Sequence, residues 1–160
     1  MDVSSQNPTA RRESPPSVCR EVITHSAEET VEFGRQLAAQ IKPPCLILLE
    51  GELGSGKTTL VKGLVAGLGA AREEEVTSPS FTLVHQYGHE CKVYHVDLYR
   101  IEGARDFASL GLDELFEENA TVIIEWGERI GDNAPELQWR VRLEHVTNEE
   151  RRIAVENVRQ

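Results

Sequence analysis

Hydrophobic positions recur along the chain with two different spacings, and together they predict alternating strands and helices. The apolar runs 45–49 and 121–126 have the length of buried strands in a parallel sheet. The segments 26–41 and 57–68 instead repeat apolar residues every three or four positions, which predicts helices that bury one face. A capping-box pattern at 26–29 supports the start of the first helix.

Antiparallel strands are predicted around this core. Two strand-like runs, 81–87 and 92–98, are separated by the turn residues 88–90, which indicates a hairpin. Apolar and polar residues alternate over 137–143, and a partner strand is expected around 153–155 after a turn. We therefore expect a mixed sheet in which parallel core strands are flanked by helices and extended by antiparallel hairpins.

The remaining segments are less regular. Residues 1–17 are rich in Ser and Pro and lack apolar periodicity, so we expect a disordered tail. A short strand-like entry follows at 22–23, and a polar, partly helical stretch is expected at 103–119. The chain has 160 residues and is 39% hydrophobic, a size that predicts a single domain over 18–160.

Composition narrows the class of protein. The formal net charge of -10 argues against a broad nucleic-acid footprint, which needs clustered Lys and Arg. Cys19, Cys45 and Cys91 are odd in number and lack metal-type spacing, which favours a reducing, cytoplasmic setting. No apolar stretch approaches the ~18 residues of a membrane span, and no signal-peptide core is present. We therefore expect a soluble intracellular protein that does not contact a membrane.

The most specific motif follows the first apolar run directly. Residues 51–58 read Gly-Glu-Leu-Gly-Ser-Gly-Lys-Thr, a complete G-x-x-x-x-G-K-[ST] phosphate-binding loop between a strand and a helix. Its glycines let backbone N–H groups surround an anion, and the helix adds its positive end. Lys57 would reach the β- and γ-phosphates, and the Thr58 hydroxyl would ligate Mg2+. The predicted nucleotide-binding residues here are Gly51, Glu52, Leu53, Gly54, Ser55, Gly56, Lys57, Thr58 and Thr59.

Hydrolysis or phosphoryl transfer also needs a carboxylate that positions Mg2+ or water, usually at the end of a neighbouring parallel strand. Two acids fit this requirement: Glu125 ends the run Val-Ile-Ile-Glu, and Asp97 ends Val-Tyr-His-Val-Asp. The residues before Glu125 form the more continuous apolar run. The alternative is that either residue is an ordinary strand-end acid that pairs with a basic side chain such as Arg100.

Several other residues have a functional and a structural interpretation. Thr77 and Ser78, in Thr-Ser-Pro-Ser-Phe, lie where nucleotide-binding proteins often carry a loop that senses the γ-phosphate, but the same residues suit an ordinary turn. Trp126 follows Glu125 and is of a type more often found in the core. Three histidines in the predicted hairpin, His85, His89 and His95, are more typical of packed or exposed positions than of a metal site.

Five blocks follow one another along the chain: the phosphate-binding loop, Thr-Ser-Pro-Ser-Phe-Thr-Leu-Val, His-Val-Asp-Leu-Tyr-Arg, Leu-Gly-Leu-Asp-Glu-Leu-Phe and Ile-Ile-Glu-Trp. In this order they resemble the TsaE (YjeE) family over about residues 22–158. The family comprises bacterial P-loop ATPases of tRNA threonylcarbamoyladenosine modification. The resemblance implies slow ATP hydrolysis in concert with TsaD and TsaB, the proteins that install the threonylcarbamoyl group on adenosine 37 of certain tRNAs. It implies little or no direct tRNA binding by this chain.

The resemblance also implies roles for individual residues. Lys57 would contact phosphate, Thr58 and Glu125 would hold Mg2+, and Asp97 would be important for hydrolysis. It further implies that three residues lie near the nucleotide: Thr24, Ser26 and Trp126. From the terminal hairpin, Arg151 or Arg152 could also reach it. The chain departs from the family by carrying Gly127 where Pro usually follows the Glu-Trp pair.

Other functions remain open at this stage. A small-molecule kinase would share the loop and the size, but it would need an acceptor pocket and several arginines around the transferred phosphate. A GTPase would need N-K-x-D and D-x-x-G motifs, which the sequence lacks. A nucleotide-gated assembly module with incidental hydrolysis is a third alternative. No arginine finger is evident in the motif set, so we expect a partner to supply the missing charge.

Overall fold

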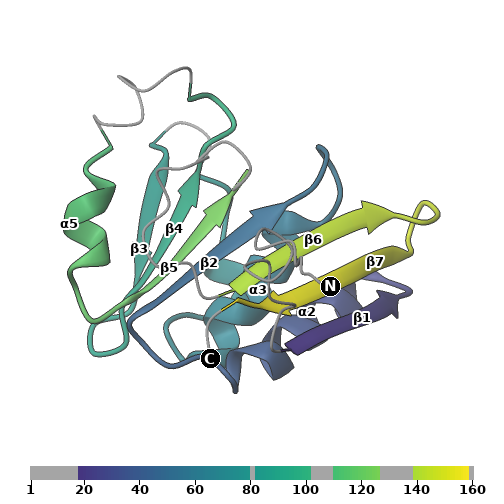
Figure 1. The fold of residues 1–160 in the computed structure, drawn as a ribbon, viewed down its shortest axis with the longest axis horizontal. Helices are drawn as coiled ribbons and strands as arrows, with labels where there is room; N and C mark the ends of the chain where they lie inside the picture. Colours follow the sequence, from purple (N-terminus) through teal and green to yellow (C-terminus); the bar gives the residue numbers. More distant parts are fainter. Residues whose placement is uncertain (1–17, 80–81, 102–109, 127–138, 159–160) are drawn as a thin grey trace, which may run out of the picture.

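The computed structural model describes residues 18–79, 82–101, 110–126 and 139–158. Its elements alternate as the sequence analysis predicts, with one mixed sheet at the centre (Figure 1). In chain order they are β1 (Val18–Thr24), α2 (Ala27–Ala38), β2 (Cys45–Glu50), α3 (Lys57–Gly67), the 3-10 helix η1 (Glu73–Glu75), β3 (Val84–Tyr87), β4 (Val93–Asp97), α5 (Leu112–Phe116), β5 (Thr121–Glu125), β6 (Trp139–His145) and β7 (Arg151–Asn157).

The strand order across the sheet is β1-β7-β6-β2-β5-β4-β3. The central strands β6, β2, β5 and β4 are parallel, whereas β3 pairs antiparallel with β4 at one edge and β7 and β1 continue antiparallel at the other. The predicted mixed α/β fold is therefore confirmed. Because β6 pairs parallel with β2, the terminal hairpin extends the parallel core directly.

Both faces of β2, β4 and β5 are buried. In β2, Ile47 and Leu49 pack on the side of α2 and α3, while Leu46 and Leu48 pack on the opposite side with Leu112 of α5. Figure 1 shows α5 lying apart from the α2 and α3 pair. Since side chains alternate between the faces, residues 93, 95 and 97 of β4 share the α3 face. This alternation brings the strand-end acids toward the start of α3.

Helices α2 and α3 pack closely because glycines lie at their contact. A Cβ atom added at Gly63 would lie 2.0 Å from the carbonyl oxygen of Val31, and one at Gly34 would lie 2.7 Å from that of Leu60. No side chain could be added at these separations without moving a helix backbone. The close contact fixes α3, and with it the loop that precedes α3, against the rest of the core.

The predicted boundaries differ from the observed ones where the backbone turns. The predicted strand 81–87 begins only at Val84, and Leu83 has a φ of 70°. The predicted strand 121–126 ends at Glu125 because Trp126 has a φ of 61°, in the left-handed region that an extended strand cannot contain. Helix α2 ends at Ala38 rather than at residue 41.

The start of α2 follows the predicted capping pattern with one change. The Glu29 backbone N–H donates to the Ser26 hydroxyl at 3.1 Å, as a capping box requires. The Glu29 carboxylate, however, accepts from the backbone N–H of His25, one residue before the cap, and this bond lowers the pKa of the carboxyl. Ser26 is thereby fixed at the exposed start of the helix.

Some predictions fall on parts of the chain that are not described. They include the tail at 1–17, Ser80, Phe81, the first part of the stretch 103–119, and Gly127. From 110 onward that stretch contains the short helix α5. The division into a tail and one domain from residue 18 stays a prediction. In the described part of the chain, no helix is both long and apolar enough to cross a bilayer.

Candidate functional site

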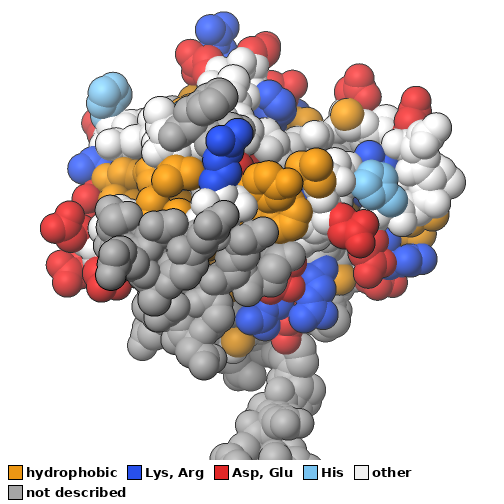
Figure 2. Space-filling model, turned by 90° about the horizontal axis from the view of Figure 1, so that it is seen from above, with side chains coloured by type: hydrophobic (Ala, Val, Ile, Leu, Met, Phe, Trp, Pro, Cys, Tyr) orange, Lys and Arg blue, Asp and Glu red, His pale blue; other side chains and the backbone are white. Residues whose placement is uncertain are grey.

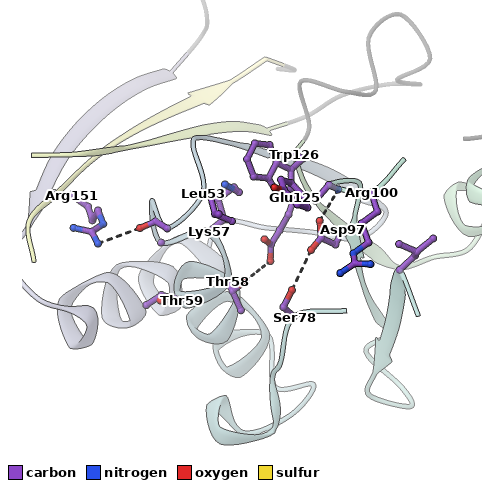
Figure 3. A pocket seen from close by; sticks show the side chains of 14 residues that line it. Leu53, Lys57, Thr58, Thr59, Ser78, Asp97, Arg100, Glu125, Trp126 and Arg151 are labelled. Carbon is purple, nitrogen blue, oxygen red and sulfur yellow. Dashed lines mark hydrogen bonds between the residues drawn. The ribbon is translucent and has the colours of Figure 1, made fainter. Parts of the chain in front are cut away.

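The parallel strands β2, β5 and β4 end at the same edge of the sheet, and a cavity of about 390 Å³ opens there. The glycine-rich loop, residues 51–58, forms one wall, and the ends of β4 and β5 form the other (Figure 3). This edge is seen from above in Figure 2, where apolar side chains gather near the middle and acidic ones toward the periphery. The lining residues are Leu53, Gly54, Gly56, Lys57, Thr58, Thr59, Ser78, Leu83, Asp97, Tyr99, Arg100, Glu125, Trp126 and Arg151.

The backbone of the glycine-rich loop is shaped by its glycines, two of which lie beside the cavity wall and the start of α3. Gly51 has a φ of 150°, and a Cβ there would lie 2.5 Å from the Ser55 hydroxyl oxygen and 2.6 Å from the Leu143 carbonyl oxygen. Gly56 has a φ of 103° and is the N-cap of α3, with no side chain over the first turn. The N–H groups at the start of α3 are thus uncovered by a cap and border the cavity, an arrangement that suits an anion.

Lys57 lies in this loop with its side chain almost entirely buried. Its ammonium donates to the carbonyl oxygens of Gly51 at 2.6 Å and Glu52 at 3.0 Å. It also lies 3.9 Å from the centroid of the Trp126 ring. These are neutral partners, so a phosphate brought to the loop would compete for the ammonium as a stronger, charged acceptor.

Glu125 connects the end of β5 to the start of α3. One oxygen of its carboxylate, Oε2, accepts from the Thr58 hydroxyl at 2.8 Å and lies 2.6 Å from Nε2 of His95. Glu125 as a whole is only 3% exposed. A hydroxyl and a carboxylate are oxygen ligands of the kind Mg2+ prefers.

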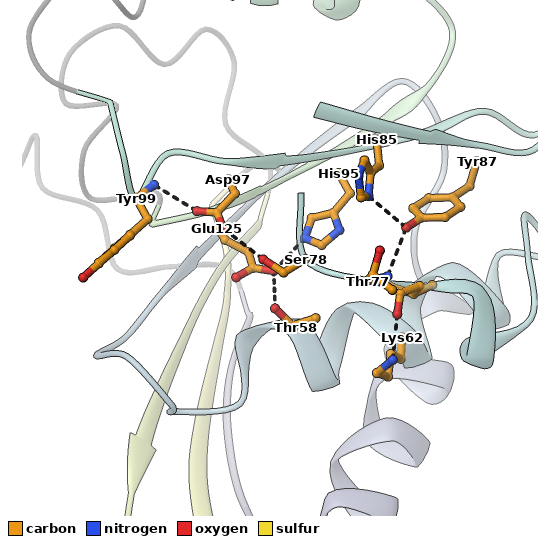
Figure 4. Close-up of polar contacts among 11 residues, drawn as sticks. Thr58, Lys62, Thr77, Ser78, His85, Tyr87, His95, Asp97, Tyr99 and Glu125 are labelled. Carbon is orange, nitrogen blue, oxygen red and sulfur yellow. Dashed lines mark hydrogen bonds and ion pairs between the residues drawn. The ribbon is translucent and has the colours of Figure 1, made fainter. Parts of the chain in front are cut away.

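Asp97 is held at the end of β4 by two donors. Its Oδ2 accepts from the Ser78 hydroxyl at 3.2 Å, and its Oδ1 accepts from the backbone N–H of Tyr99 at 2.9 Å (Figure 4). Asp97 is opposite Glu125 in the register of the two parallel strands. The site thus contains two buried carboxylates, each anchored by a hydroxyl from a different loop or helix.

The cation chemistry that the site can support follows from these donors. Among the described residues, no group of three or more His, Cys, Asp and Glu side chains could hold a metal ion. Thr58 and Glu125 fit Mg2+ because that ion is commonly bound through one or two protein oxygens, with phosphate and water supplying the rest.

Thr77 and Ser78, the residues predicted to lie in a loop that senses the γ-phosphate, have different surroundings in the structure. Ser78 lines the cavity and contacts Asp97. Thr77 does not line it, and its backbone N–H donates to the Tyr87 hydroxyl at 3.3 Å. The carbonyl of Val76, just before Thr77, accepts from the Lys62 ammonium at 2.7 Å. The loop is therefore attached to α3 on one side and to β3 and β4 on the other (Figure 4).

The other predicted residues divide among neighbouring cavities. Ser26 lines a second cavity, of about 270 Å³, that shares Gly56, Thr59 and Arg151 with the first. Thr24 lines neither of these cavities, because it is buried and its hydroxyl lies 2.7 Å from that of Thr30. Three residues of the glycine-rich loop line a third cavity beside the end of β6: Gly51, Glu52 and Ser55.

Two residues outside the predicted nucleotide-binding and catalytic sets, Arg151 and His95, contact the glycine-rich loop or a site carboxylate. Arg151 donates to the carbonyl oxygens of Thr147, Asn148 and Glu150 in the β6–β7 turn, and to that of Gly54 at 3.3 Å. It was one of two arginines expected near the nucleotide, and it lines both cavities. His95, expected to be a packed or exposed residue, contacts Glu125 directly; its alternation with Asp97 was the available signal.

The comparisons with known proteins agree on one family. Residues 24–153 match the model of the family described as threonylcarbamoyl adenosine biosynthesis protein TsaE. The chain is 35% identical over 133 residues to a tRNA threonylcarbamoyladenosine biosynthesis protein TsaE from Treponema pallidum, covering 83% of this chain and 97% of that protein. A protein of the same name from Bacillus subtilis is 37% identical over 131 residues, with 81% and 80% covered.

A solved structure is also similar to this chain in both fold and sequence. The crystal structure of Bacillus subtilis YdiB superposes with a TM-score of 0.71 and 31% sequence identity, covering 89% of this chain and 87% of that one. The sequence match spans the glycine-rich loop, both strand-end acids and the first residues of β7. This chain therefore belongs to the TsaE family of threonylcarbamoyl adenosine biosynthesis proteins.

Proposed function

We propose that this protein is a Mg2+-dependent ATPase that acts with TsaD and TsaB in the threonylcarbamoyladenosine modification of tRNA at position 37. The observation that carries the proposal is the hydrogen bond between Thr58 and Glu125. It joins the residue after the loop lysine to the end of the neighbouring parallel strand, at the wall of the cavity that Lys57 also lines. Nucleotide-hydrolysing sites need this combination of phosphate cradle and metal-holding acid.

The chain's own residues would divide the work as follows. The N–H groups of the glycine-rich loop and the Lys57 ammonium bind the phosphates, and the Lys57 charge stabilises the negative charge that develops during transfer. The Thr58 hydroxyl and the Glu125 carboxylate would hold Mg2+, which when bound would supply positive charge against the phosphates. Trp126 covers Lys57 and limits the access of water to it.

Asp97 orients the attacking water in this proposal. The water oxygen bonds to the γ-phosphorus, the bond from that phosphorus to the bridging oxygen breaks, and ADP leaves with the electron pair. The water's protons end on the released phosphate and in solvent. Ser78 and the Tyr99 N–H hold Asp97 so that its carboxylate keeps one direction toward the cavity.

We expect slow turnover by the isolated protein because Arg151, which lines the cavity together with Arg100, already has backbone partners. Arg151 is bound to carbonyls of the β6–β7 turn and of Gly54, an arrangement that secures the loop. We therefore propose that TsaD and TsaB complete the site with additional stabilisation, an effect worth roughly 10^3-fold or more in comparable systems. The net charge of -10 supports contact with protein partners rather than with tRNA itself. We also propose a cytoplasmic setting, which the odd number of cysteines favours.

A calorimetric titration tests the first part of the proposal. ATP is titrated into the purified protein with Mg2+ and, separately, with EDTA, and the same titrations are made on the Lys57→Ala variant. The proposal predicts that Mg2+ strengthens ATP binding and that the Lys57→Ala substitution weakens it. A small-molecule kinase would bind ATP equally well but would transfer phosphate to an acceptor, so phosphate release in the absence of any acceptor separates the two activities.

A further inference from the structure

The contact between His95 and Glu125 is explained neither by the motif nor by the proposed function. His95 lies in the middle of β4, is 0% exposed, and shares the α3 face with Val93 and Asp97. A packed histidine in a core usually satisfies both ring nitrogens. Here Nε2 is 2.6 Å from Oε2 of Glu125, whereas Nδ1 is buried without a partner among the described residues.

This asymmetry argues against a purely structural role. An unsatisfied buried polar atom destabilises the folded state, so an aliphatic side chain would suit the core better at this position. An ionised carboxylate can only accept, so with Glu125 in that state Nε2 of His95 carries the hydrogen and donates it to Glu125. The group that His95 contributes is therefore an Nε2–H directed at one oxygen of the proposed metal ligand.

The same oxygen also accepts from the Thr58 hydroxyl. Two donors on Oε2 fix the rotation of the carboxylate, and the other oxygen, Oε1, accepts no hydrogen bond from the described residues. A hydroxyl that ligates a cation through its lone pairs still needs an acceptor for its hydrogen, and Oε2 supplies it. The arrangement thus leaves Thr58 oxygen and Glu125 Oε1 as the pair suited to a cation or its water.

We propose that His95 is a positioning residue that donates from Nε2 to Glu125 and thereby orders the Thr58–Glu125 pair for Mg2+. The inference rests on the proposed function, because it assigns the way in which the metal-holding pair is kept in place. Partners of metal ligands commonly act in this way, and their loss typically costs about 10–100-fold in metal affinity or activity.

The test compares ATP affinity with Mg2+ and with EDTA, and the ratio of the two is the Mg2+ enhancement. His95→Leu removes the donor and is expected to reduce the enhancement by about 10–100-fold while ATP affinity in EDTA is unchanged. His95→Gln, whose amide nitrogen can reach the position of Nε2, is expected to restore most of it. An enhancement at the unsubstituted level in His95→Leu, or an equal loss in both variants, would overturn the proposal.

A matched control lies on the neighbouring strand. His85 is opposite His95 in the β3–β4 register, but its ring contacts the Tyr87 hydroxyl rather than a site carboxylate. His85→Leu should keep the full Mg2+ enhancement, and a loss there equal to that of His95→Leu would mean that the effect is a general one of histidine removal. The folded state of each variant is checked by its circular dichroism and melting temperature.

Nitrogen NMR on the unsubstituted protein covers the case in which His95→Leu fails to fold. The proposal expects His95 as the neutral tautomer with hydrogen on Nε2, and a change in its Nε2 shift when Mg2+ is added to the ATP-bound protein. Hydrogen on Nδ1 instead would contradict it. Failure of the proposed function gives a different pattern: no Mg2+ enhancement in the unsubstituted protein, or full enhancement in Glu125→Gln.

Discussion

Asp97 and Glu125 lie directly opposite each other at the ends of the adjacent parallel strands β4 and β5. Both carboxylates are buried, and each is anchored by a different hydroxyl: Ser78 for Asp97 and Thr58 for Glu125. The two acids therefore occupy distinct environments within one site. Glu125 is joined to the glycine-rich loop and its helix, whereas Asp97 is joined to the loop that follows α3 and η1.

Asp97→Asn should separate hydrolysis from binding. The amide keeps the shape of the side chain but orients water poorly, so we expect ATP hydrolysis to fall by about 10^2-fold or more while ATP affinity stays near that of the unsubstituted protein. The measurement is phosphate release at saturating ATP, with calorimetry for affinity. An Asp97→Asn protein that hydrolyses ATP normally would remove Asp97 from the mechanism.

Lys57→Ala should act mainly on binding. Its ammonium would exchange the Gly51 and Glu52 carbonyls for phosphate oxygens, and a charge-assisted bond of this kind is worth about 1.5–3 kcal/mol. ATP affinity should therefore fall by roughly 10- to 150-fold. Calorimetry measures the loss, and affinity unchanged in the variant would contradict the assignment of the loop as the phosphate site.

Arg151→Ala and Arg152→Ala form a matched pair. Arg151 secures the loop through Gly54 and lines both cavities, so its loss should weaken ATP binding by about tenfold, equivalent to ~1.4 kcal/mol. Arg152 pairs with Glu21 and Glu144 at exposed positions, where such pairs contribute ~0–1 kcal/mol to stability. Arg152→Ala should leave ATP affinity unchanged, and an equal effect of both substitutions would refute the distinction.

Gly63→Ala should destabilise the fold through the α2–α3 contact. The added methyl group would meet the Val31 carbonyl oxygen, so one helix must shift, and overpacking of this kind costs typically about 1–3 kcal/mol. Gly69 is the control: its φ is 77°, nothing lies within 4 Å of an added Cβ, and asparagine tolerates this backbone conformation. Denaturant unfolding should show a loss for Gly63→Ala and little change for Gly69→Asn.

Local patterns predicted the parts of the site that depend on neighbours in sequence. The loop motif located Lys57 and Thr58, and the apolar runs before Asp97 and Glu125 indicated that both acids end parallel strands. Their mutual placement followed from the rule that parallel strands end at one edge of a sheet. The mixed sheet itself was predictable because buried and half-buried strands have different spacings of apolar residues.

Long-range pairing determined the rest. Arg151 reaches the glycine-rich loop because β7 pairs with β6, which pairs with β2, and no local pattern reports that register. The contact of His95 with Glu125 likewise depends on the β4–β5 alignment. Strand β5 stops before Trp126 because the backbone of Trp126 is left-handed, which the apolar run in the sequence does not indicate. Thr77 and Ser78 are neighbours with the same chemistry, and only the tertiary fold distinguishes which one contacts Asp97.

The central claim is that this chain forms an ATPase site that its partners complete. The most direct test measures Mg2+-dependent ATP hydrolysis by the pure protein alone and then with TsaD and TsaB from the same organism, alongside Glu125→Ala. We predict slow turnover alone, strong stimulation by the two partners, and loss of both activities in the variant. Fast turnover of the isolated protein, or stimulation that persists in Glu125→Ala, would contradict the account.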